Sequence, residues 1–309
     1  MSLLPNNCIS DELAMLDLST PKPQHANEAS HVKVLDTPSG IASMLSILES
    51  IEHSSGAIYV DLEGVKLSRH GTISLIQIYV PLCEQIFVID VYTLGKQAFE
   101  TPSARNTTFR SVLESSCTKK YFFDVRNDAD ALFSLFGIRL ACVVDVQLLE
   151  LASRRGPKHV LCGLAACVEQ EQISTGPPTD KWQKNKKECA KMFDPKLGES
   201  YEVFNLRPLP QALIEYCVGD VQYLPELSAI YQGRLSKNWL RKVLVESEAR
   251  IAESRITSYQ PHSKKKRFGP KKWRYLPASQ LAGVMTRRIQ PASEIPAGSS
   301  KPDMSQRTV

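Results

Sequence analysis

The sequence predicts an α/β fold built on a mixed sheet, in which an antiparallel meander lies beside parallel strands. Three strand-like runs come first, at residues 57–62, 72–80 and 85–91, and short turns separate them. Because connections this short join antiparallel neighbours, the three runs predict the meander. From residue 109 onwards helical and strand patterns alternate, which predicts parallel pairing with helices on the faces of the sheet.

The individual elements follow from hydrophobic periodicity. A short strand-like run at 31–35 precedes apolar residues at 41, 45, 48 and 51, which recur at the spacing of an amphipathic helix. Strands of the second half are expected at 120–123 and 142–145. Helices are expected at 109–116, 127–136, from 146, from 160, at 209–231 and at 237–254.

Length and charge divide the chain into one domain with flanking segments. The 309 residues are 42% apolar, which is enough for one sizeable core. We expect a disordered leader at 1–30, a domain at 31–256 with an insertion at 176–207, and a basic disordered tail at 257–309. Of the net charge of +5, residues 234–309 contribute +12, from 17 Lys and Arg against 5 Asp and Glu, which leaves −7 for the remainder. A basic end suits a polyanionic partner, although a solvated tail explains it equally well.

Targeting features predict a soluble, intracellular protein without membrane contact. No apolar run approaches the roughly 20 residues of a membrane span, and the first residues lack the pattern of a signal peptide. The eight cysteines include no Cys-x-x-Cys pair, which fits reduced thiols. The run Lys264-Lys265-Lys266-Arg267 favours either contacts with nucleic-acid phosphates or a nuclear-localisation patch, so both nucleus and cytoplasm are open.

Two carboxylates end the first strand of the meander. Asp61 and Glu63 are spaced i, i+2, so on a strand they point to one face while Leu62 points to the other. Like charges this close repel each other, and divalent cations are their natural counter-charge. Taken alone, Asp-x-Glu more often marks a strand that runs out into solvent.

A second segment, at residues 123–130, offers three aspartates. Helical geometry places Asp128 on the core-facing side of the following helix and Asp130 nearer solvent, while Asp124 precedes the helix. The alternative for Asp128 is an N-terminal helix cap, a position that aspartate favours.

A third segment pairs a tyrosine with an aspartate. Tyr216 and Asp220 are spaced i, i+4, so they share one face of a helix, and Leu213 and Leu224 continue the same stripe. Both polar groups therefore lie where apolar side chains are expected. The alternative to a functional site is a Tyr–Asp hydrogen bond buried in the core.

Taken together, the order Asp61-x-Glu63, Asp128 and Tyr216-x-x-x-Asp220 resembles the DEDDy branch of the DEDD 3′–5′ exonucleases. The resemblance spans roughly residues 33–232 and is closest to the ribonuclease D-like group and to eukaryotic 3′–5′ exonuclease-domain proteins. It implies a ribonuclease-H-like three-layer α/β/α fold, consistent with the order of elements above. The flanking residues agree with the three motifs of the family, through Ser74-Leu75-Ile76-Gln77-Ile78, Val144-Asp145-Val146-Gln147 and Arg207-Pro208-Leu209.

The resemblance also implies a mechanism with two divalent cations, Mg²⁺ or Mn²⁺, about 4 Å apart. Such hard cations take oxygen ligands, which suits four carboxylates. By resemblance, Asp61, Glu63 and Asp220 hold the ion that activates water, Asp61 bridges to the second ion, and Asp128 supports that ion through water. Tyr216 orients the attacking water, because a phenol with a pKa of about 10 positions a water more readily than it deprotonates one.

The implied activity is a metal-dependent 3′–5′ exonuclease that releases nucleoside 5′-monophosphates from single-stranded RNA or DNA. The alternative is a catalytically weak or inactive module of the same fold that binds RNA or a protein partner. All four carboxylates and the tyrosine are present, which favours the enzyme. Of the neighbouring residues, Asp145 is expected to be structural, since it ends a strand and starts a helix, whereas Arg126 and Lys158 are candidate phosphate contacts.

Overall fold

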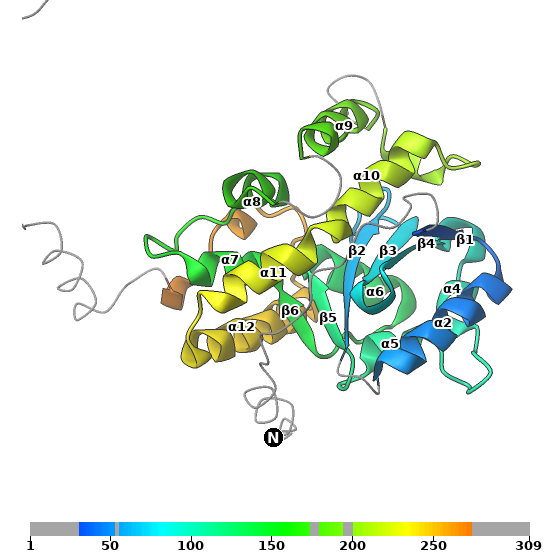
Figure 1. The fold of residues 1–309 in the computed structure, drawn as a ribbon, viewed down its shortest axis with the longest axis horizontal. Coiled ribbons are helices and arrows are strands. Elements are labelled where there is room, and N and C mark those ends of the chain that lie inside the picture. Colours follow the sequence, from blue (N-terminus) through cyan, green and yellow to red (C-terminus); the bar gives the residue numbers. More distant parts are fainter. Residues whose placement is uncertain (1–30, 53–55, 174–178, 194–199, 274–309) are drawn as a thin grey trace, which may run out of the picture.

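The computed structural model describes residues 31–52, 56–173, 179–193 and 200–273. Six strands in these ranges form one sheet in the order β1-β4-β3-β2-β5-β6 (Figure 1). The strands β2, β3 and β4 form an antiparallel meander, whereas β1, β5 and β6 each pair in parallel with a neighbour, so the predicted mixed sheet is confirmed. Their bounds are β1 Val32–Leu35, β2 Ala57–Glu63, β3 Leu75–Val80, β4 Gln85–Asp90, β5 Lys119–Phe122 and β6 Val143–Asp145.

Helices surround this sheet, and none in the described part of the chain is long and apolar enough to cross a membrane. Their bounds are α2 Pro38–Glu52, α3 Val91–Leu94, α4 Gln97–Glu100, α5 Phe109–Glu114, α6 Arg126–Phe136, α7 Val146–Ser153, α8 Leu164–Glu171, α9 Thr179–Lys191, α10 Gln211–Gln222, α11 Leu224–Gly233 and α12 Lys237–Arg255. The described residues also contain 3₁₀ helices at Pro81–Cys83, Tyr201–Asn205, Lys264–Arg267 and Lys271–Trp273.

Three helices depart from the sequence-based expectation. The single helix expected at 209–231 is two helices, α10 and α11, because Pro225 lacks the N–H that would continue the first one. The helix expected from residue 160 begins only at Leu164, since Val160 forms a β-bridge with Phe268. Helix α9 lies within the predicted insertion, where the sequence analysis assigned no element.

The alternation of side chains along β2 separates the apolar cores on the two faces of the sheet. Ile58, Val60 and Leu62 point into an apolar core that α2, α5 and α6 close. Tyr59 points to the opposite face, towards the cores formed with α7, α10 and α11. The sheet therefore lies between two helical layers, as expected. The face of β2 that carries Ile58, Val60 and Leu62 is covered by an apolar core, whereas the opposite face contacts α10.

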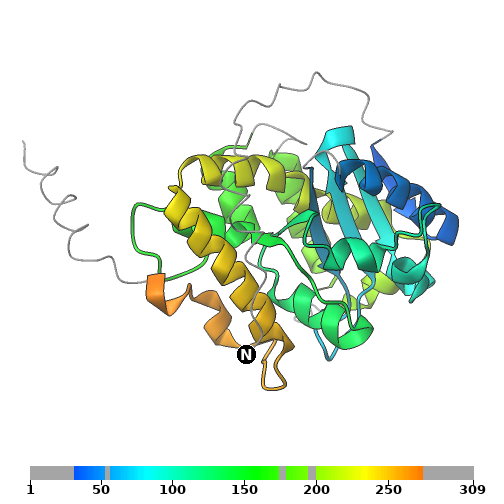
Figure 2. The same ribbon diagram turned by 90° about the horizontal axis from the view of Figure 1, so that it is seen from below.

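The described start of the predicted tail is folded onto the domain, which differs from the disordered tail expected from residue 257. Tyr259 and Trp273 are buried, and Trp273 packs edge-on against Trp239 of α12 at 5.5 Å. Figure 2 shows this segment, in orange, beside α12. The predicted leader and residues 274–309 lie outside the described residues. The positive charge of this segment predicts a mobile tail. Its aromatic residues Tyr259 and Trp273 are nevertheless buried, because the folded domain provides an apolar surface that the sequence does not reveal.

Candidate active site

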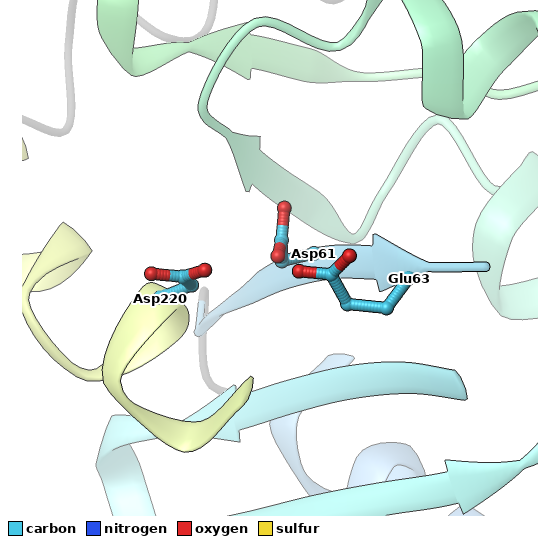
Figure 3. Close-up of side chains that lie close together, drawn as sticks. All are labelled: Asp61, Glu63 and Asp220. Atoms are coloured by element: carbon cyan, nitrogen blue, oxygen red, sulfur yellow. The ribbon is translucent and has the colours of Figure 1, made fainter. Parts of the chain in front are cut away.

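Three carboxylates from distant parts of the sequence meet at one place. Asp61 and Glu63 leave the same face of β2, and Asp220 projects from α10, which packs across β2 and β3 (Figure 3). One oxygen from each of the three carboxylates lies within 4.8 Å of the others. We call Asp61, Glu63 and Asp220 the carboxylate trio.

The environment of the trio disfavours negative charge. Burial and the neighbouring Asp220 raise the pKa of Asp61 to about 7. Burial and the charges of Asp61 and Asp220 raise the pKa of Glu63 well above its ordinary value. Burial also raises the pKa of Asp220, although a lysine nearby opposes this shift. Three acids that repel one another in a half-buried site need a compensating cation.

That lysine is Lys186 of α9. Its ammonium forms an ion pair with Asp220 and lies 5.1 Å from the centroids of the Trp182 and Tyr216 rings. Burial alone would lower the pKa of this ammonium, but Asp220 and the other acids of the trio hold it above its ordinary value. The sequence analysis named no site residue within the insertion at 176–207. The missed signal was local: Trp182, Lys186 and Cys189 recur at i, i+4 and i+7, the spacing of one helix face.

A glycine explains how α9 reaches the site. The indole of Trp182 is buried and lies directly on Gly219 of α10, where a β-carbon would stand 2.1 Å from Nε1 of Trp182. Only glycine permits so close an approach between the two helices. Gly219 immediately precedes Asp220, so this contact sets α9 above the carboxylate of Asp220.

Tyr216 shares the inner face of α10 with Asp220, as the i, i+4 spacing predicted. It is 9% exposed, and Phe193 packs edge-on against its ring at 5.7 Å. Burial and the charge of Glu63 raise the pKa of the Tyr216 phenol far above its ordinary value, so the hydroxyl keeps its proton. Asp220 is engaged by Lys186 rather than by the buried Tyr–Asp hydrogen bond considered above.

Asp128 lies near the trio but outside it. It is buried in the first turn of α6, and burial followed by the charge of Asp61 raises its pKa. The helix has Val125 at its N-cap and no side-chain cap, so Asp128 does not fill the capping role considered as its alternative. Each of the four predicted carboxylates thus faces the same region, and three of them converge closely.

The neighbouring aspartates have structural partners. Asp145 accepts hydrogen bonds from the backbone N–H groups of Asp124 and Val125 and caps α7 through Gln147, which supports its structural assignment. Asp130 was expected nearer solvent, but it is fully buried and receives both the Nε and the backbone N–H of Arg69. That expectation was wrong because the turn carrying Arg69 covers this side of α6.

Neither suggested phosphate contact is free in this structure. Arg126 binds Asp124 through two hydrogen bonds and donates to the carbonyl of Lys266. Lys158 is buried, donates to the carbonyl of Arg154 and lies over the Trp239 ring. Both cations serve the packing of the domain.

Comparison with known proteins identifies the class. The 3′–5′ exonuclease family matches residues 32–235, well over half of the chain, and the chain belongs to this family. Its fold is similar to that of RNase D from Trypanosoma brucei, with 20% identity and a TM-score of 0.61 over 79% of this chain and 80% of that chain.

Two further solved structures share the fold. The catalytic core of RRP6 from Trypanosoma brucei is 19% identical, with a TM-score of 0.55 over 81% of this chain and 57% of that chain. RNase D from Escherichia coli is 18% identical, with a TM-score of 0.52 over 74% of this chain and 51% of that chain. A search of curated proteins gave no match. These structural likenesses show the RNase D-like fold.

Proposed function

We propose that this protein is a metal-dependent 3′–5′ exonuclease that hydrolyses the terminal phosphodiester of single-stranded nucleic acid and releases nucleoside 5′-monophosphates. The observation that carries the proposal is the carboxylate trio, whose oxygens gather within 4.8 Å from two elements far apart in sequence. Such a gathering costs free energy through repulsion and desolvation, and a cation-dependent function explains why the fold bears that cost.

The donor set fits a hard divalent cation. The trio offers carboxylate oxygens, the ligands that Mg²⁺ and Mn²⁺ prefer, and Asp128 adds a fourth carboxylate on the same side. Gln77 is the cross-strand neighbour of Asp61 and is fully buried. Its side-chain amide has no hydrogen-bond partner among the described residues, so a buried donor and a buried acceptor beside the trio are still unpaired. When bound, such cations neutralise the phosphodiester and acidify water.

The remaining residues have roles that their surroundings support. Tyr216 keeps its proton and offers a hydroxyl that holds and orients a water beside the trio. Phe193 packs against the Tyr216 ring, and the Lys186 ammonium lies between the rings of Tyr216 and Trp182, so little solvent reaches this place. Asp128 supports the second cation, as the resemblance implies.

The substrate class in this proposal is supported by solved structures of similar fold. One Trypanosoma brucei RNase D structure is a complex with RNA U12, and another is a complex with GMP. An oligonucleotide and a nucleoside monophosphate are the substrate and product classes that the proposed reaction requires. A single-stranded 3′ end fits best, because an unpaired end reaches a site between packed helices without unpairing costs.

The test is a degradation ladder with 5′-labelled single-stranded RNA and DNA in Mg²⁺, Mn²⁺ or EDTA. We expect shortening from the 3′ end in either metal, with no shortening in EDTA or in Asp61→Asn. The exposed Asp36 at the end of β1 gives the control, because Asp36→Asn removes the same charge away from the trio. Intact substrate in every lane contradicts the proposal.

The second candidate is a binding module of the same fold. The ion pair between Lys186 and Asp220 favours it, because a lysine that permanently neutralises Asp220 would leave no place for a cation. This candidate predicts nucleic-acid or protein binding without cleavage and no stabilisation of the folded protein by Mn²⁺, whereas a cation that binds only the native state must stabilise it.

A further inference from the structure

An exposed cluster of positive charge lies next to the site on the folded segment after α12. Lys264, Lys265 and Arg267 are exposed on the 3₁₀ helix Lys264–Arg267, and we call these three residues the basic ridge. In the part of the chain that the structure describes, no carboxylate pairs with any of them. Lys272 nearby does pair, with Glu246 at 3.1 Å, so pairing is not simply absent from this segment.

The fourth cation of the run points inward and fixes the ridge. The ammonium of Lys266 donates to Oδ1 of Asn127 at 2.5 Å, and Arg126 donates to the carbonyl of Lys266 at 2.9 Å. The hydroxyl of Tyr259 donates to the same Asn127 oxygen at 3.1 Å. These bonds attach the ridge to the first turn of α6.

A second set of bonds holds the other side of the ridge. The backbone N–H of Leu161 donates to the carbonyl of Arg267 at 3.0 Å, and that of Gly269 donates to the carbonyl of His159 at 2.9 Å. Gly269 permits this contact, because a β-carbon there would stand 2.5 Å from the side chain of Leu151. A merely solvated charged run requires no such anchoring on both sides, since its side chains need only water.

The anchor places the ridge beside the second carboxylate motif. Asn127, which holds Lys266, immediately precedes Asp128, and the charge of Lys266 acts on the Asp128 carboxylate. Exposed cations therefore begin next to the carboxylates proposed to bind the metal, on a chain whose residues before 234 carry a net negative charge. A polyanion whose end lies at the trio can therefore meet exposed positive charges on this segment.

We propose that the basic ridge binds the backbone phosphates of the single-stranded nucleic acid whose 3′ end lies at the trio. This inference rests on the proposed function and extends it by naming the surface that holds the substrate upstream of the scissile bond. Lysine and arginine that neutralise phosphates release counterions, so the ridge contributes a salt-dependent, sequence-independent part of the affinity.

The test replaces all three ridge side chains by glutamine, as Lys264→Gln/Lys265→Gln/Arg267→Gln. Binding of a 5′-labelled 20-nucleotide single-stranded RNA is measured in EDTA at several salt concentrations with the full chain. Loss of three contacts lowers the slope of log affinity against log salt by about 2, at about 0.7 per contact for a single strand. Between 50 and 200 mM salt the wild type then loses about 20-fold more affinity than the variant.

A matched control removes equal charge elsewhere. Three exposed cations near the β1 edge of the sheet, at the opposite end from β6, serve this purpose as Lys33→Gln/Lys96→Gln/Arg105→Gln. We expect a smaller change in affinity and a wild-type slope. Hydrolysis of the p-nitrophenyl ester of thymidine 5′-monophosphate provides a second readout, because a substrate with one phosphate does not extend to the ridge, and its rate should be unchanged in the ridge variant.

The outcomes separate the two proposals. If wild type cleaves RNA but the ridge variant binds RNA with the wild-type affinity and the wild-type salt slope, the ridge inference is overturned. A variant with unchanged RNA binding and altered nuclear import overturns it in the same way. If wild type cleaves no substrate, the proposed function fails, and the binding curves in EDTA still decide the ridge. A ridge variant that loses the ester hydrolysis as well would also overturn the inference, because its effect would then lie in the site itself.

Discussion

Replacing Lys186 by methionine tests the most consequential contact of the site. The ammonium of Lys186 is the positive charge that the structure places against the trio, through its ion pair with Asp220. A divalent cation held by the same carboxylates must displace this ammonium. Lys186→Met therefore makes the metal-free protein less stable and the metal-binding affinity higher.

The expected magnitude follows from burial. Removing one partner of a buried ion pair costs about 3–5 kcal/mol, because the other charge is left uncompensated. A quarter of the Lys186 side chain is exposed and 8% of the Asp220 side chain, so we expect about 2–3 kcal/mol at pH 8. If the metal-bound forms of variant and wild type are equally stable, the same free energy appears in binding. The Kd for Mn²⁺ then falls by about 30- to 150-fold, at about 1.4 kcal/mol per tenfold.

Urea unfolding in EDTA measures the loss of stability, and calorimetric titration with Mn²⁺ measures the gain in affinity. Lys187→Met is the control, because Lys187 is the exposed neighbour of Lys186 on α9 and carries the same charge. Both quantities should stay within about 0.5 kcal/mol of the wild type in this control.

Two results would refute this reasoning. Unchanged stability together with unchanged affinity would mean that the ion pair has no energetic weight. A loss of stability accompanied by weaker Mn²⁺ binding would mean that Lys186 builds the site instead of competing for it.

Three other substitutions probe the site and its supports. Because the pKa of Asp61 is raised to about 7, the native state binds a proton more tightly than the unfolded chain, so the stability of the metal-free protein falls as pH rises from about 4 through 7. Urea unfolding of Asp61→Asn should show a smaller dependence of stability on pH, and at pH 8 this variant should be more stable than the wild type. An unchanged pH dependence would contradict the raised pKa of Asp61. Gly219→Ala should cost about 1–3 kcal/mol by overpacking against Trp182, and Trp182→Ala in the same chain should relieve that cost in a double-mutant cycle, whereas additive effects would exclude the contact. Arg69→Met should cost about 3–5 kcal/mol in urea unfolding, because it leaves buried Asp130 uncompensated and frees the chain after α12, and a change below about 0.5 kcal/mol would show that the pair is dispensable.

Local periodicity was enough to orient the carboxylates of each motif. The period of two along β2 placed Asp61 and Glu63 on one face, and the i, i+4 spacing placed Tyr216 on the same face of α10 as Asp220. These directions depend only on backbone geometry within one element. For the same reason the meander and the parallel strands, which follow from the lengths of the connections, were predicted correctly.

Contacts between elements could not be obtained in this way. That Lys186 reaches Asp220 depends on α9 docking through Trp182 onto Gly219, and the sequence separation of these residues carries no such information. The burial of Asp130 likewise depends on Arg69, which comes from the turn after β2.

The sequence by itself therefore determined the class of fold, the direction of each catalytic candidate and the charge of the chain. Only the tertiary structure decided which cation faces the trio and where the run Lys264–Arg267 lies. A charged side chain has no preferred partner along the chain, because its energy depends on desolvation and on charges that folding brings near. Hydrophobic periodicity depends on residues that are neighbours in sequence, whereas the partner of a charged side chain is determined only when distant elements pack together.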